Sequence, residues 1–253
     1  MGDRIINIGD GFWNIRGSFK VGGIVEIGTQ ASLVRLASGG FVLLDAYTLT
    51  GPVEREVMAL TDQGRAVEAI LNLHPFHTIH TKASAAQFPS ARLYGTARHK
   101  AKAPGLDWEA LTTDDPELHE QLSADLSFTV PRGVDFIASN ESLHFSSVLA
   151  FHPASRTLHV DDTLTWSTLP LVKGLVFHPT LKSVLERRPG AVADFRQWAL
   201  ELADRCEDVE HLVTAHMRAL PPASSAGTPL SDRVRTALKK VEKVLSAHER
   251  RHG

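Results

Sequence analysis

Three histidines lie close together, directly after an apolar run that is typical of a buried strand. His74, His77 and His80 fall within the segment "AILNLHPFHTIH", residues 69–80. Imidazole nitrogens are common ligands of zinc and related metals, so this cluster indicates a metal site. However, no carboxylate lies among the histidines, and Phe76 stands in their midst. The same residues also fit the alternative in which His77 and His80 cap and solvate the start of a helix.

Pro75 determines how this segment can fold. Proline cannot continue a central strand, so the strand is expected to end near His74. The chain then turns, and His77 can point back toward His74. His80 shares a face with His77 if a helix begins here, because residues three apart are neighbours on a helix.

Further candidate ligands stand beside other strand-like runs. Asp161 and Asp162 follow "TLHV", His216 ends "EHLVTAH", and His144 opens a hairpin. Metal sites in α/β proteins gather ligands where strands end, because the loops there converge on one edge of the sheet. Each residue alone fits a structural or solvated role, but their similar positions favour a shared ligand set.

The elements that must position these residues alternate between β and α. Residues 5–45 indicate β-structure, with a hairpin turn at Ser38-Gly39-Gly40. A second hairpin turns at "HPAS", and short strands are expected in "AVEAILNLH", around Leu93 and Tyr94, and in "EHLVTAH". Helices are expected over residues 52–64, in "TKASAAQFPS" before Pro89, over most of 179–205, and over 230–253. Residues 99–125 are polar and irregular, apart from one short helix.

Two segments, 32–50 and 147–165, repeat one pattern. Each has a strand, a turn, a strand, an aspartate and Thr-Leu-Thr, which gives Asp45 and Asp162 equivalent places. The repeat predicts two similar halves packed sheet on sheet, so the fold class is α/β, an αββα sandwich of two mixed β-sheets flanked by helices. Chance similarity between two hairpins is the alternative.

Composition narrows the class of partner and the location. The 27 basic and 29 acidic residues give a net charge of −2, so we expect no nucleic-acid partner. The single cysteine, Cys206, excludes an intrachain disulfide. The N-terminus lacks a secretory signal and no apolar run reaches transmembrane length, which predicts a cytoplasmic protein without a membrane partner.

The C-terminal part reads as a separate segment. Residues 221–229, "PPASSAGTP", have the composition of a flexible linker, and an amphipathic helix follows. We therefore expect one domain over residues 1–220 and a linker with a helix over 221–253. The helix carries an apolar stripe of Val234, Leu238, Val241 and Leu245. This stripe packs either on its own domain or on a second copy of the chain, giving a homodimer.

These motifs resemble the metallo-β-lactamase superfamily, in which a strand ends in the two-metal ligand block His-x-His-x-Asp-His. The block can be laid on residues 72–77, where His74 and His77 match its second and third histidines. Asn72 then replaces the first histidine and Phe76 replaces the aspartate. The resemblance covers roughly residues 20–220 and is strongest to divergent, functionally unassigned branches of the family.

The downstream motifs extend the resemblance. His144 matches the family's third-motif histidine, Asp162 its metal-bridging carboxylate, and His216 its last histidine. The implied metal ligands are therefore His74, His77, His144, Asp162 and His216. A competing register places His77 and His80 on the second and third histidines. We prefer the first register because it keeps the distance to Phe88-Pro89 and lets His74 follow the strand directly.

The resemblance implies a metal-dependent hydrolase of an unidentified small-molecule substrate. Zinc is the expected metal, with iron or another divalent ion as alternatives. Because ligands are missing, we expect weak binding of about one ion per chain or fewer. One alternative is a non-catalytic protein of the same fold that has lost its metals and binds a small molecule or a partner. Another is a one-metal protein that uses His77, Asp162 and His216 for binding or redox sensing.

Overall fold

The structure is a computed structural model that describes residues 3–21, 25–169, 173–216 and 219–253. The chain divides into two compact units. The first unit comprises residues 1–127, 152–155 and 215–218, and the second comprises residues 128–151, 156–214 and 219–253.

The first unit is built on a six-stranded mixed sheet with the strand order β1-β2-β5-β6-β7-β8. Its strands are β1 (Arg4–Gly9), β2 (Phe12–Gly17), β5 (Thr29–Arg35), β6 (Phe41–Leu44), β7 (Val67–Asn72) and β8 (Arg92–Gly95). The strands from β1 to β6 pair antiparallel, whereas β6, β7 and β8 run parallel. A small antiparallel pair joins β3 (Lys20–Val21) and β4 (Val25–Glu26).

The crossovers that the parallel strands require contain α1 (Gly51–Leu60), between β6 and β7, and α2 (Thr81–Gln87), between β7 and β8. Two short helices, α3 (Ala97–Lys102) and α4 (Pro116–Gln121), follow β8. Val57 of α1 packs with Leu33, Leu43 and Ile70 in the buried core of this unit. Because β7 and β8 are parallel neighbours, the chain segments that follow them leave from the same edge of the sheet.

The second unit has a four-stranded sheet in the order β14-β11-β10-β9, in which β11 and β14 are parallel. A separate antiparallel pair consists of β12 and β13. The strands are β9 (Ser127–Thr129), β10 (Leu149–His152), β11 (Thr157–Val160), β12 (Leu164–Ser167), β13 (Gly174–Phe177) and β14 (His211–Thr214). The helices are α5 (Leu181–Val184), α6 (Ala191–Arg205) and α7 (Leu230–His252). Phe145, Phe177, Phe195 and Trp198 form a cluster of ring contacts in its interior.

Three elements differ from the sequence-based expectations. The helix expected over most of 179–205 is broken into α5 and α6, because Pro189 and a left-handed Gly190 (φ 83°) interrupt it. Residues 163–180 contain the strands β12 and β13, which were not predicted. The irregular stretch 99–125 holds part of α3 and all of α4, so two short helices occur where one was expected.

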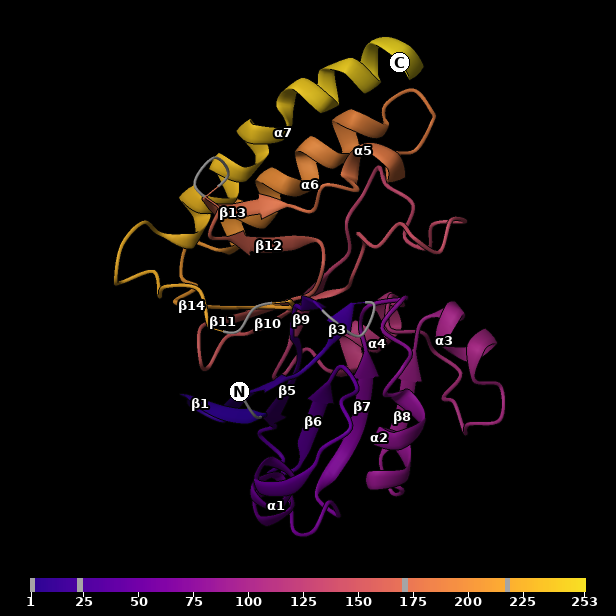
Figure 1. Ribbon diagram of the computed structural model, residues 1–253, viewed down its shortest axis with the longest axis vertical. Helices are drawn as coiled ribbons and strands as arrows, with labels where there is room; N and C mark the ends of the chain where they lie inside the picture. The colour runs from indigo at the N-terminus through magenta and orange to yellow at the C-terminus, as the bar shows by residue number, and fades with distance from the viewer. Residues whose placement is uncertain (1–2, 22–24, 170–172, 217–218) are drawn as a thin grey trace. The chain divides into compact units, whose positions relative to one another are not determined.

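The helix α7 lies along α6 (Figure 1) and buries most of its apolar stripe within its own unit. Val234 and Leu245 are fully buried, Leu238 is buried, and Val241 is half-buried. Arg196 of α6 pairs with two glutamates of α7 at 2.6 and 2.9 Å. The stripe is thus covered without a second copy of the chain, and both the homodimer and the boundary at residue 220 stay predictions.

The segment that precedes α7 is held in place. Ser224 donates its backbone N–H to the Glu210 carbonyl and its hydroxyl to the Val209 carbonyl. These bonds anchor a stretch whose composition is typical of a flexible linker. No helix in the described part of the chain combines the length and the apolar character needed to cross a membrane.

We predict that Leu245→Ala lowers the free energy of unfolding by about 2–5 kcal/mol, because it leaves a cavity under α7. Urea-induced unfolding would measure this change. Lys243→Ala on the exposed side of the same helix is the control and should change the free energy by less than about 0.5 kcal/mol. Equal effects of the two substitutions would show that α7 does not contribute its apolar stripe to the core.

Candidate functional site

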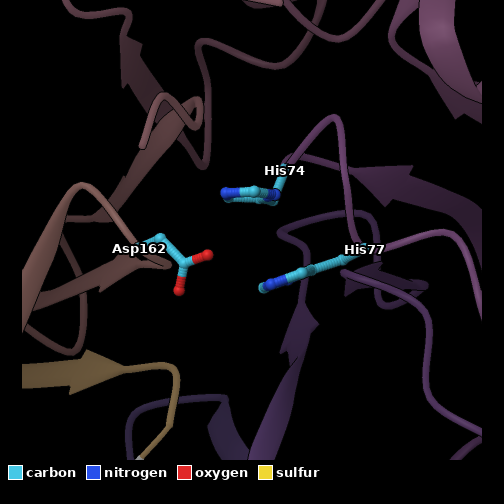
Figure 2. A group of neighbouring side chains, drawn as sticks. All are labelled: His74, His77 and Asp162. Carbon is cyan, nitrogen blue, oxygen red and sulfur yellow. The ribbon is translucent and has the colours of Figure 1, made fainter. Parts of the chain in front are cut away.

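His74 and His77 lie in the tight turn that follows β7. The His77 N–H donates to the His74 carbonyl at 3.1 Å, which closes the turn. The two imidazoles stack with ring centroids 4.1 Å apart and an interplanar angle of 21° (Figure 2). A nitrogen of each ring lies within 4.8 Å of a nitrogen of the other, so both can serve one metal ion.

Asp45 anchors the strand end from which this turn begins. Its carboxylate accepts the Leu73 N–H at 2.8 Å, and its own N–H bonds to the Leu71 carbonyl at 2.8 Å. Asp45 has a φ of 60°, a left-handed conformation that aspartate tolerates better than most residues. This anchoring role was not predicted from the sequence and follows only from the parallel pairing of β6 and β7.

His216 also belongs to the first unit and lies beside His77. Their ring centroids are 5.5 Å apart and the rings are nearly perpendicular, at 83°. The His216 Nδ1 lies 2.9 Å from the Gly28 carbonyl oxygen, which can only accept, so Nδ1 must donate. The neutral ring therefore presents a lone pair at Nε2, as in many metal-binding histidines.

The His74 ring is placed differently. Its Nδ1 accepts the Phe76 N–H at 3.1 Å, so this nitrogen carries a lone pair. A metal ion that used the same nitrogen would have to replace that hydrogen bond. His74 is thus a weaker candidate ligand than His216, whose lone pair lies on the other side of the ring from its hydrogen bond.

His144 and Asp162 form a donor pair in the second unit. The His144 Nδ1 lies 3.8 Å from the Asp162 Oδ2, and the Asp162 side chain, also drawn in Figure 2, is 2% exposed. The His144 Nε2 donates to the Glu141 carbonyl at 2.9 Å, which leaves Nδ1 to face the carboxylate. Two acceptor atoms facing each other are stabilised by a cation, either a proton on Nδ1 or a metal ion.

Asp161 rather than Asp162 is the residue directly after β11, so Asp161 holds the place of Asp45 relative to its strand. His159 and Asp161 are both buried and offer donor atoms within 4.8 Å of each other. His159 was not identified from the sequence. The signal that could have found it is the spacing of two residues to Asp161, since side chains two apart on a strand share a face.

The Asn72 side chain is used in hydrogen bonds within the first unit. Its Nδ2 donates to the Tyr94 carbonyl at 2.8 Å, and its Oδ1 accepts from the Thr81 hydroxyl at 3.4 Å. Both ends of the amide thus link β7 to neighbouring elements. The residue that stands at the family's first histidine is a structural connector.

Phe76 is buried, and the Arg98 guanidinium lies over its ring, 4.6 Å from the centroid. This is a cation–π contact, and it brings a positive charge to the position where the resemblance puts a carboxylate. Arg98 was not identified from the sequence. The signal was its place three residues beyond Gly95, at the end of a strand parallel to β7.

His80 occupies the N-cap position of α2 and is engaged away from the other histidines. Its Nδ1 lies 2.9 Å from the Thr48 hydroxyl, and its ring packs on Tyr47 at 4.8 Å. Burial, with a smaller contribution from His77, lowers the pKa of His80. The geometry favours the register that uses His74 and His77.

His99 supports His77 from α3. Its Nδ1 accepts from the Thr96 N–H at 3.3 Å, so its Nε2 donates to the His77 carbonyl at 3.4 Å. Burial lowers the pKa of His99 to about 4, which keeps the ring neutral and this donor arrangement intact at neutral pH. His99 therefore positions the backbone of His77.

The comparison with solved structures identifies the fold. A metallo-β-lactamase from Erythrobacter litoralis, with beta-mercaptoethanol in its active site, superposes with a TM-score of 0.63 at 14% identity, covering 94% of this chain and 96% of the other. FIM-1 from Pseudomonas aeruginosa, in a mono-zinc form, gives a TM-score of 0.59 at 12% identity, covering 95% and 96%. A metallo-β-lactamase from Hirschia baltica gives 0.59 at 12% identity, covering 94% and 98%.

These likenesses confirm the predicted fold class, the α/β metallo-β-lactamase fold with two mixed sheets and flanking helices. No protein-family model and no curated protein sequence matches the chain. At such low identity the likeness is one of fold, and the activity has to be argued from the side chains of this chain.

We predict that His77→Ala lowers the amount of zinc that the purified protein retains, with at least about tenfold weaker binding, because a ligand is lost. His80→Ala is the control and should leave zinc binding unchanged, because His80 is engaged with Thr48 and Tyr47. Elemental analysis after dialysis against defined zinc concentrations would measure both. Loss of zinc in His80→Ala but not in His77→Ala would reverse the choice of register.

Proposed function

We propose that this chain, which has the metallo-β-lactamase fold, is a metal-dependent hydrolase that acts on a small molecule. Its proposed metal centre has fewer ligands than the two-metal block of the family. The proposed ligands are His74, His77, His144, Asp162 and His216. The observation that carries the proposal is that each unit gathers imidazole and carboxylate side chains in the segments that match the family's ligand motifs. A divalent ion bound there supplies Lewis acidity and lowers the pKa of a bound water to about 7.

We propose one ion per chain, with zinc as the metal and iron or another divalent metal as the alternative. The Asn72 amide is already used by Tyr94 and Thr81, so it adds no ligand. Phe76 contributes no charge, and the Arg98 cation beside it disfavours a second cation. FIM-1, a protein of the same fold, has been solved in a mono-zinc form, which supports the compatibility of this fold with one ion.

The residues of this chain would divide the remaining tasks. His216 and His144 are oriented by the carbonyl groups of Gly28 and Glu141, which keeps one nitrogen of each ring free of its proton. The Asp162 carboxylate offsets the charge of the ion. The Phe76 ring forms an apolar wall beside His74, with the two ring centroids 6.0 Å apart.

A second candidate is a non-catalytic protein of the same fold that binds a small molecule. The Arg98–Phe76 contact favours it, because a positive charge stands where hydrolytic relatives are expected to hold a carboxylate. In that case the histidines and Arg98 would bind an anionic group of the ligand directly. Metal content and hydrolysis distinguish the two candidates.

The test of hydrolase activity uses p-nitrophenyl acetate and other generic esters as probes. We expect hydrolysis that increases with bound zinc, is lost after treatment with a chelator, and returns when zinc is restored. His77→Ala should lower the rate together with the zinc content, whereas His80→Ala should retain both. Bound zinc without hydrolysis would favour the non-catalytic candidate, and activity unaffected by the chelator would contradict the proposed centre.

Placing a carboxylate at position 76 tests whether its absence limits the number of zinc ions that the chain binds. We predict that Phe76→Asp raises the zinc stoichiometry above that of the unchanged chain, because it adds an anionic ligand. Phe76→Asn is the matched control, with the same shape and no charge, and should not raise it. Calorimetric titration with zinc measures the stoichiometry. An equal rise in both variants would attribute the effect to the loss of the ring instead of the charge.

A further inference from the structure

The second unit contains a groove of about 1040 Å³ that shares no residue with the proposed metal centre. One side is formed by residues 182–187 and another by the last turns of α7, and residues of the loop 135–143 also line the groove. The Asp135 N–H bonds to the Val184 carbonyl at 2.8 Å, and His248 donates to the Glu186 carbonyl at 3.0 Å, so the sides are fixed to each other. The volume lies near the upper end of the range for small-molecule pockets, roughly 300–1,000 Å³.

The groove is lined by three exposed cations, and the charge of one of them, Arg187, acts on the Asp135 carboxyl. Lys182, Arg187 and Arg251 make no hydrogen bond or ion pair with any residue that the structure describes. Other arginines of this unit behave differently, since Arg188 pairs with Glu186 and Asp194 at 2.6 and 2.7 Å. Asp135 is the one carboxylate among the described residues that line the groove, so the lining has a positive net charge.

Two histidines add to this positive lining. The rings of His248 and His252 lie 4.6 Å apart, and the Nε2 of His248 is used by the Glu186 carbonyl. Desolvation, followed by the charges of His248 and Arg251, lowers the pKa of His252. The basic side chains of both sides are thus close enough to affect one another, and a bound anion would relieve their repulsion.

The C-terminal position of α7 explains only part of this arrangement. Basic residues in the last turn of a helix offset the negative end of its dipole, which accounts for Arg251 and His252. It does not account for Lys182 and Arg187, which line the groove from another segment of the chain. A bound anion would account for the presence of all three cations at one groove.

We propose that this groove binds a phosphorylated small molecule and that Lys182, Arg187 and Arg251 hold its phosphate dianion. Guanidinium groups match phosphate oxygens with two parallel hydrogen bonds, and three cations suit a doubly charged group. Ser139, Asn140 and Ser183 line the same groove and offer hydroxyl and amide groups to the organic part. The inference does not depend on the metal centre.

The test is calorimetric titration of the full chain at low salt with adenosine 5′-monophosphate and glucose 6-phosphate, compared with adenosine and glucose. We expect at least one phosphate ester to bind one to one, at least about tenfold more tightly than its neutral counterpart. Arg187→Gln with Arg251→Gln should weaken this binding at least about tenfold. Lys239→Gln with Lys243→Gln removes the same charge from exposed positions of α7 outside the groove and should change it less than about twofold.

Several results would overturn the proposal. One is the absence of binding by either ester, and another is an equal loss in the charge-matched control. Tighter binding of citrate than of the esters would assign the groove to carboxylates, and binding of a single-stranded oligonucleotide alone would assign it to a macromolecule. Binding that a chelator abolishes but the groove substitutions do not would place the phosphate at the metal centre. If the double variant fails to fold, Lys182→Gln replaces it with the same expected direction.

Discussion

The hydrogen bond from the Leu73 N–H to the Asp45 carboxylate is the interaction on which the placement of the histidines depends. It extends the parallel pairing of β6 and β7 by one residue beyond the end of β7, two residues before Pro75, which cannot continue a strand. The turn at residues 74–77 therefore begins from a backbone that is held on both sides. Because that start is fixed, the His74 and His77 rings stack, and His77 meets His216 within the same unit.

The hydrogen bonds of the two ring nitrogens distinguish His216, a candidate ligand, from His99 and His80. His216 and His99 both donate one ring proton to a backbone carbonyl. His216 then presents its second nitrogen beside another imidazole, whereas the second nitrogen of His99 accepts from Thr96. His80 is close to the cluster in sequence, yet its Nδ1 is used by Thr48. Counting histidines within a short segment cannot make this distinction, because it depends on carbonyl groups supplied by distant segments.

The sequence predicted the elements that depend on patterns within a few neighbouring residues. The two hairpins, the strand before His74 and the amphipathic α7 all follow from apolar periodicity and turn residues. The strands β12 and β13 were missed because each has only four residues, and their partner contacts come from α7 and from each other. Arg98 was missed because its position over Phe76 exists only when β8 pairs parallel to β7.

Positively charged side chains lie beside the proposed metal ligands of the first unit and at the groove of the second unit, and their effects on ligand binding differ. In the first unit, Arg98 is half-buried and lies over an aromatic ring, which partly offsets the cost of holding a cation near imidazoles. That arrangement is compatible with one metal ion or an anionic ligand, but it opposes a second metal ion. In the second unit, Lys182, Arg187 and Arg251 are exposed at a groove, whereas Arg188 pairs with Glu186 and Asp194. Gathering three cations at one groove costs mutual repulsion, and a ligand that carries the opposite charge would offset this repulsion.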